Sequence, residues 1–82
     1  MGLDVVELMM EVEDVFDIQI PDDDYPQFET VGDLSDYLAR RLPNSTPELV
    51  WRTLRGIVSE QLLIPRDQIH RSSRWVEDLK CD

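Results

Sequence analysis

Apolar residues recur three or four positions apart over residues 3–16, with acidic residues between them. This spacing gathers the apolar side chains on one side of a helix, so it predicts an amphipathic helix. We expect the helix to end near Asp17, because the isoleucine-containing sequence that follows leads into Pro21, and proline interrupts helices. Residues 22–26, Asp-Asp-Asp-Tyr-Pro, are typical of a turn or of at most one helical turn.

Two further helices are predicted. Residues 30–33, Thr-Val-Gly-Asp, form a capping box with Asp in place of Glu, and a short apolar pattern then continues until Pro43. The pair Thr46-Pro47 is an N-cap followed by proline at the first helical position, and the apolar stripe behind it extends to about Leu63. Gly56 lies inside this last helix, where we expect it to permit close contact with another helix.

Residues 66–82 are polar with isolated apolar anchors, which is typical of a long loop pinned onto a core. The expected anchors are Ile69, Trp75, Val76 and Leu79. No segment alternates as a strand does, so we predict the all-α class, as a small bundle of three to four helices. Residues 1–42 and 48–82 are joined by a linker, residues 43–47, and make one domain, because neither block of about 40 residues could bury a core alone.

Charge is distributed unevenly along the chain. The 82 residues carry 18 acids and 8 bases, a net charge of −10. Residues 1–42 hold 12 of the acids and two bases, whereas residues 43–82 hold six of each. Such acidity disfavours nucleic acid and anionic membranes and favours partners with basic patches. We expect a cytoplasmic protein, because the chain shows no membrane segment or signal peptide and has a lone cysteine, Cys81.

The first block resembles the acyl carrier proteins over residues 3–16, at Ile20-Pro21-Asp22 and over residues 30–38. In that family the second helix opens Asp-Ser-Leu-Asp, runs through Glu-Leu to a Phe, and is followed by Ile-Pro-Asp and a Thr-Val-led helix. The second block resembles the first part of the same family, through Glu60-Gln61-Leu62 and the Trp-Val-Glu-Asp-Leu sequence of residues 75–79. The resemblance implies a carrier fold whose two parts stand in reversed order.

This order suggests a circular permutation at the modification site. Asp82 stands where the family has the Asp before its serine, and Gly2, followed by Leu3, stands where the serine would be. The alternative is a fragment that spans two tandem carrier domains and completes its fold through another chain. In the permuted chain, Leu42–Pro47 must bridge the two blocks, and six residues reach at most about 20 Å. A longer gap would require a domain-swapped dimer instead of a monomer.

The resemblance implies that the missing serine would carry 4′-phosphopantetheine. Gly2 has no hydroxyl, and no other serine stands in an Asp-Ser-Leu context, so we expect no cofactor in this chain. The implied function is a non-enzymatic carrier scaffold or protein-interaction module of fatty-acid or polyketide-type metabolism. The alternative is a fragment or swapped form of a true carrier that becomes competent when a partner chain supplies the serine.

Four acids of the first predicted helix match the family's recognition acids: Asp4, Glu7, Glu13 and Asp14. The resemblance implies that they bind basic patches on synthases and acyl-transfer enzymes. A simple solvated helix surface would explain the same acids. Electrostatic steering of this kind speeds association and weakens as salt concentration rises.

No other group of residues predicts a catalytic or metal site. Residues 22–24 lack the glycine and the distal glutamate of an EF-hand, and His70 has no nucleophile near it in sequence. Cys81 is better explained as a small filler residue than as a reactive thiol. Two tryptophans and two methionines are expected to be core or loop anchors: Trp51, Trp75, Met9 and Met10. For the two methionines the resemblance implies an alternative, the apolar lining near the family's acyl pocket.

Overall fold

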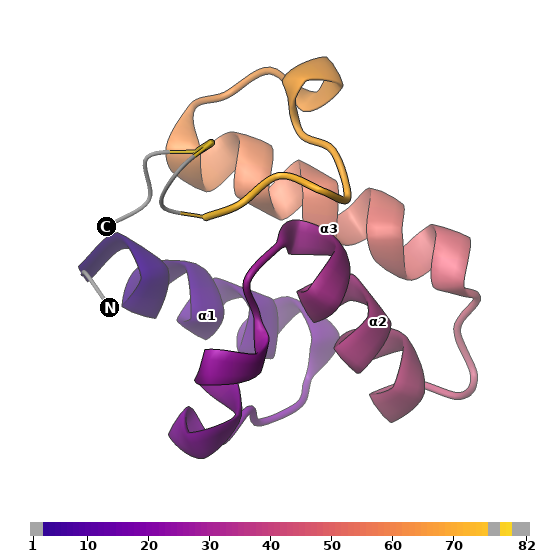
Figure 1. The fold of residues 1–82 in the computed structure, drawn as a ribbon. Helices are drawn as coiled ribbons and strands as arrows, with labels where there is room; N and C mark the ends of the chain where they lie inside the picture. Colours follow the sequence, from indigo (N-terminus) through magenta and orange to yellow (C-terminus); the bar gives the residue numbers. More distant parts are fainter. Residues whose placement is uncertain (1–2, 76–77, 80–82) are drawn as a thin grey trace.

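The computed structural model describes residues 3–75 and 78–79 of the chain, and this part is helical (Figure 1). In chain order its elements are the α-helix α1 (Leu3–Phe16), the 3-10 helix η1 (Asp22–Gln27), the α-helices α2 (Val31–Arg41) and α3 (Pro47–Leu62), and the 3-10 helix η2 (Arg66–Gln68). Within the described residues the only β pairing is an isolated bridge between Thr30 and Arg74. The predicted all-α class is confirmed.

Helix α1 ends where the sequence predicts. Asp17 adopts a left-handed backbone with φ of 55°, a conformation that Asp tolerates better than most residues. The N–H of Ile18 then donates to the carbonyl oxygen of Glu13 at 3.1 Å, and the N–H of Ile20 donates to Oε2 of the Glu13 side chain at 2.9 Å. Glu13 therefore holds the chain as it leaves the helix.

The acidic turn after α1 is longer than predicted. It forms the six-residue helix η1, whereas the sequence indicated at most one helical turn. The reason is a tertiary contact that local sequence does not reveal: the Tyr37 hydroxyl of α2 donates to Oδ2 of Asp24 at 2.8 Å. Asp24 also accepts a hydrogen bond from the Gln27 amide at 3.2 Å, which supports the second turn.

The capping box of α2 is confirmed in both directions. The Asp33 N–H donates to Oγ1 of Thr30 at 3.1 Å, and the Thr30 N–H donates to Oδ2 of Asp33 at 3.1 Å. These bonds satisfy backbone donors that a helix start would otherwise leave unpaired. The helix ends at Arg41, two residues before Pro43.

Helix α3 begins with the predicted cap, since Oγ1 of Thr46 accepts from the Leu49 N–H at 3.1 Å. It ends at Leu62, and Leu63 follows in a left-handed conformation with φ of 57°. Gly56 makes its close approach to the short helix η2 and not to another α-helix. A Cβ at this position would lie 3.0 Å from Nη2 of Arg66, the first residue of η2.

Helix α3 packs against both α1 and α2 (Figure 1). Their buried apolar side chains belong to one core. Its fully buried centre includes two residues from each helix: Leu8, Val12, Leu34, Leu38, Leu54 and Val58. The segment after α3 is pinned by buried Ile69, Trp75 and Leu79, as predicted. Val76, the fourth expected anchor, lies outside the described residues.

The connection between α2 and α3 is a tight turn. The Ser45 N–H donates to the Leu42 carbonyl at 3.0 Å, and Thr46 already caps α3, so the loop occupies residues 42–46. Farther along, the segment from Arg71 to Arg74 crosses the start of α2. Within residues 3–75 and 78–79, no helix combines the length and apolar character needed to cross a bilayer.

Candidate docking face

The outer side of α1 exposes apolar side chains among carboxylates. Val6 is 41% exposed and Met10 is 62% exposed. They lie one helical turn apart and nearly opposite Leu8 and Val12, the residues that face the core. Burial of the core side thus leaves a short apolar strip pointing to solvent.

Three of the four predicted recognition acids can be located. The Glu7 and Asp14 side chains are exposed on the outer side of α1, while Glu13 is half-buried. The side chain of Asp4 lies outside the described residues. Glu13 accepts the Ile20 N–H through Oε2. Glu13 therefore combines a structural bond with a place on the acidic surface.

Two shallow hollows meet at Met10. One, of about 490 Å³, lies between α1 and the end of α3 and is lined by Met10, Gln61 and three carboxylates, those of Glu7, Glu11 and Asp14. The other, of about 500 Å³, lies at the C-terminal end of α1: Met10, Glu13, Asp14, Asp17, Ile18 and Gln19 line it. Met10 is thus an apolar centre with acids on both sides, a surface suited to a partner that combines cationic and apolar side chains.

The outward position of Val6 and Met10 was not predicted from the sequence. Both were counted in the apolar pattern of the helix, and Met10 was expected in the core or in a pocket lining. Met9 is indeed in the core, at 1% exposure, but Met10 is not. The residue spacing contains this information, because Val6 and Met10 form a second apolar stripe on α1, nearly opposite the stripe of Leu8 and Val12.

The attachment position for a phosphopantetheine arm cannot be matched to any described hydroxyl. Gly2, Cys81 and Asp82 all lie outside the described residues. Two described serines have structural roles: Ser35 is buried in α2, and the Ser59 hydroxyl donates to the Ile64 carbonyl at 2.6 Å.

The other candidates are accounted for by exposure to solvent or by structural hydrogen bonds. The His70 side chain is exposed, and its backbone N–H donates to Oγ of Ser73 at 2.9 Å. Asp24 accepts hydrogen bonds inside its own helix and from Tyr37. Among residues 3–75 and 78–79, no three His, Cys, Asp or Glu side chains are grouped so that they could hold a metal ion.

The two tryptophans differ in environment. Trp75 is buried in the core at 5% exposure, as expected of an anchor. Trp51 is half-buried at the edge of the core, between two arginines. The guanidinium of Arg55 lies 5.8 Å from the centre of its ring and that of Arg71 lies 5.3 Å from it, both within the range of cation–π contacts.

Comparison with known proteins gives matches to the first half of the chain. Residues 3–38 match a family described as the phosphopantetheine attachment site. The chain is similar to proteins named acyl carrier protein from three bacteria. It is 55% identical to that of Syntrophobacter fumaroxidans over 39 residues, 48% of each chain. It is 52% identical to that of Amoebophilus asiaticus over 41 residues, 50% of this chain and 51% of the relative. It is 46% identical to that of Bdellovibrio bacteriovorus over 40 residues, 49% of this chain and 51% of the relative.

These matches support a relationship between residues 3–38 and the acyl carrier proteins, as the sequence motifs implied. The chain spans about half the length of the curated relatives it matches. All three relatives are named as carriers. No solved structure matches the chain.

Proposed function

We propose that this chain is an acyl-carrier-like docking domain that presents α1 to basic surfaces of synthases or acyl-transfer enzymes. In this role it is a non-enzymatic scaffold of fatty-acid or polyketide-type metabolism. The observation that carries the proposal is the outer side of α1, where exposed Val6 and Met10 stand among carboxylates within the segment that matches the attachment-site family.

The two kinds of side chain on this face would contribute differently to binding. Carboxylates such as Glu7 and Asp14 raise the rate of encounter with a basic partner, and their effect falls as salt screens them. Met10 would add affinity after contact. Burial of a whole methionine side chain contributes about 1.5 to 3 kcal/mol, so the 62% of Met10 that is exposed could contribute roughly 1 to 2 kcal/mol.

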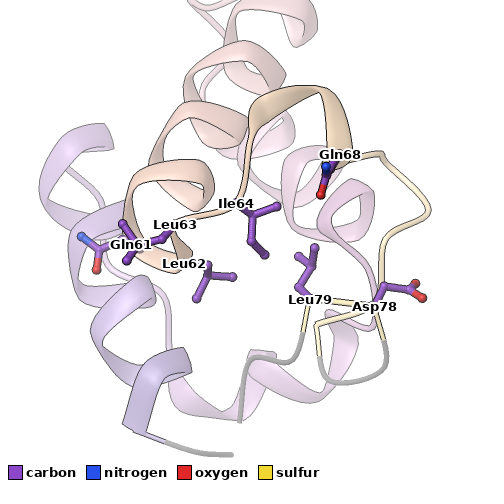
Figure 2. Close-up of a pocket in the computed structure, with 7 residues that line it drawn as sticks. All are labelled: Gln61, Leu62, Leu63, Ile64, Gln68, Asp78 and Leu79. Atoms are coloured by element: carbon purple, nitrogen blue, oxygen red, sulfur yellow. The ribbon is translucent and has the colours of Figure 1, made fainter.

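The proposal includes the permuted order of the two blocks. In support of it, α3 packs against both α1 and α2 of the same chain, and the connection before it is a short turn. The N-terminal end of α1 also lies at the same end of the molecule as the C-terminal segment that carries Leu79 (Figure 1 and Figure 2). In this order Gly2 replaces the serine, so the chain as written accepts no phosphopantetheine arm.

The absence of attachment can be tested by mass. The chain is incubated with coenzyme A and a promiscuous phosphopantetheinyl transferase, and its intact mass is then measured. We expect no gain for the chain as written and the gain of one arm for Gly2→Ser. A gain by the unaltered chain would overturn the non-carrier proposal. Failure of Gly2→Ser to gain an arm would overturn the permuted register.

The docking role is tested separately, by the affinity of the same transferase for the chain at low and high salt. Glu7→Lys should weaken binding about tenfold at low salt, because it replaces an attraction by a repulsion. The matched control is Glu48→Lys, which makes the same charge change at an exposed residue at the start of α3, away from the outer side of α1. Equal affinities for the two variants, or an affinity that does not respond to salt, would contradict docking through α1.

A second candidate is a fragment or swapped form of a true carrier that works once a partner chain supplies the serine. It is favoured by one observation, that the matches cover only about half of each relative. Light scattering of the purified chain separates the two. A monomer is expected from the permuted domain, whereas a stable dimer would support the swapped form.

A further inference from the structure

A hollow of about 530 Å³ lies between the end of α3 and the C-terminal segment. Figure 2 shows the side chains of Leu62, Ile64 and Leu79 converging on it, so its floor is apolar. Gln68 and Asp78 lie on the side away from α1. The proposed function makes no use of this hollow.

Leu63, on the rim of this hollow, is unfavourable for folding in two respects. Its side chain is 89% exposed, and its backbone is left-handed with φ of 57°. The position directly after an α-helix is commonly left-handed, and glycine is the usual residue there because a Cβ is strained in that conformation. A strained and exposed leucine beside an apolar hollow indicates a role outside folding.

This hollow adjoins the one between α1 and the end of α3, because the two share a lining residue. Gln61 lines both, on one side with Leu62 and Leu63 and on the other with Glu7 and Met10. The described residues that line this hollow and the two hollows around Met10 include six carboxylates and no lysine or arginine. The combined surface therefore has two apolar areas, one at Met10 and one at the hollow beside Leu63, with carboxylates around them.

We propose that the docking face extends from α1 across Gln61 to Leu63, and that it binds a cationic amphipathic helix of a partner protein. An apolar side chain of that helix contacts Leu63 and enters the hollow, while its lysines or arginines face Asp78 and the acids of α1. This charge selects against a second copy docking through its own acidic α1. The inference rests on the proposed function, because it takes α1 as one half of the face.

The test uses two synthetic helical peptides of equal length and equal lysine number. One has a stripe of leucines and the other has alanines at the same positions. Each is titrated into the isotope-labelled full chain, and amide chemical shifts are followed. The leucine peptide should shift the amides of Leu62, Leu63, Ile64 and Leu79 as well as those of α1, whereas the alanine peptide should shift α1 alone and bind more weakly.

Leu63→Gly separates binding from folding. It should weaken binding of the leucine peptide about tenfold, the effect of losing most of one buried leucine contact, and leave the alanine peptide unchanged. Its melting temperature should be unchanged or higher by up to about 5 °C, because glycine relieves the left-handed strain. The matched control is Leu49→Ala, a change at another leucine of α3 that is 54% exposed and lines none of the three hollows described above. It should leave the affinity unchanged.

The outcomes distinguish this inference from the proposed function. The extension to Leu63 is overturned if Leu63→Gly binds the leucine peptide with the affinity of the unaltered chain. It is also overturned if that peptide changes the amide chemical shifts of α1 alone. Docking through α1 stands in both cases. If Glu7→Lys also has no effect, the proposed function fails as well. Concentration-dependent sedimentation of the chain alone, abolished by Leu63→Gly, would assign the hollow to a second copy and overturn the inference.

Discussion

Replacing Gly32 by alanine should destabilise the domain, although alanine is the better helix former. Gly32 lies in the first turn of α2, and its N–H donates to the Arg71 carbonyl oxygen at 2.8 Å. A Cβ here would lie 2.7 Å from that oxygen and 3.1 Å from Cβ of Arg71. Both neighbours belong to the segment that crosses the start of α2, so the new methyl group meets backbone and not the end of a flexible side chain.

The crossing segment has little freedom to move away. The Val31 N–H donates to the Ser73 carbonyl at 3.0 Å, Thr30 pairs with Arg74, and the guanidinium of Arg71 bonds the Asp36 carboxylate. Overpacking typically costs about 1 to 3 kcal/mol, and a broken backbone hydrogen bond adds about 1 kcal/mol. The helix propensity of alanine returns at most about 1 kcal/mol. The net loss is about 2 kcal/mol, or a melting temperature lower by about 8 to 16 °C.

Gly56→Ala is the matched control, because it makes the same chemical change inside α3. A Cβ at Gly56 would meet Nη2 of Arg66 at 3.0 Å, which is the tip of an exposed, flexible side chain. The tip can move at little cost, so the gain in helix propensity should dominate. We expect Gly56→Ala to be neutral or up to about 1 kcal/mol more stable.

The assay is urea unfolding followed by far-UV circular dichroism, with amide hydrogen exchange as the local readout. In Gly32→Ala, exchange at residue 32 should accelerate more than exchange in the middle of α3, because the hydrogen bond to Arg71 is lost. Opposite signs for the two alanine variants are the expected result. A Gly32→Ala chain as stable as the unaltered one would refute the close approach of the crossing segment to α2.

Further predictions concern the hydrogen bonds around α2. Tyr37→Phe removes the bond to Asp24 and should cost about 1 kcal/mol in urea unfolding. Burial, and then the bond to Asp24, raise the pKa of Tyr37 above its ordinary value of 10.0. The folded state therefore favours the neutral phenol, so stability should fall as pH rises above about 10, less steeply in Tyr37→Phe, as measured by thermal melting across alkaline pH. Asp33→Ala breaks the capping box with Thr30 and should lower the free energy of unfolding by about 1 kcal/mol, whereas Asp23→Ala, on exposed η1, should not.

Local sequence was sufficient to predict the helix boundaries, because the residues that set them act on their own backbone. The Thr30 capping box and the Thr46 cap each join residues three positions apart. Helix α1 ends before Asp17, whose own backbone is left-handed. Such interactions are encoded over a few residues and survive any reordering of the blocks. The apolar anchors Ile69 and Leu79 could be predicted for a similar reason, since isolated apolar residues in a polar segment have few alternatives to burial.

Tertiary contacts explain where sequence reasoning failed. The length of η1 depends on a hydroxyl thirteen positions away in sequence, and the neighbour of Gly56 depends on how the chain returns after Pro65. The outward position of Met10 depends on which of two apolar stripes the rest of the core covers. A periodic pattern identifies both stripes but does not tell which of them faces the core. The exposure of Met10 can therefore be recognised only once the packing of α3 against α1 is known.

The same contacts hold the two sequence blocks together around one core. The first block ends at α2, and its first turn bonds the crossing segment of the second block through Val31 and Gly32. The turn that connects the blocks lies at the opposite end of α2, after Arg41. Cohesion between the blocks thus comes from the shared core and from the crossing segment, and the covalent connection needs only to close a short loop. Lengthening a loop costs little, about 0.6 kcal/mol for each doubling. A fold held in this way places weak demands on where the chain is joined, which is the physical condition for the permuted order that we propose.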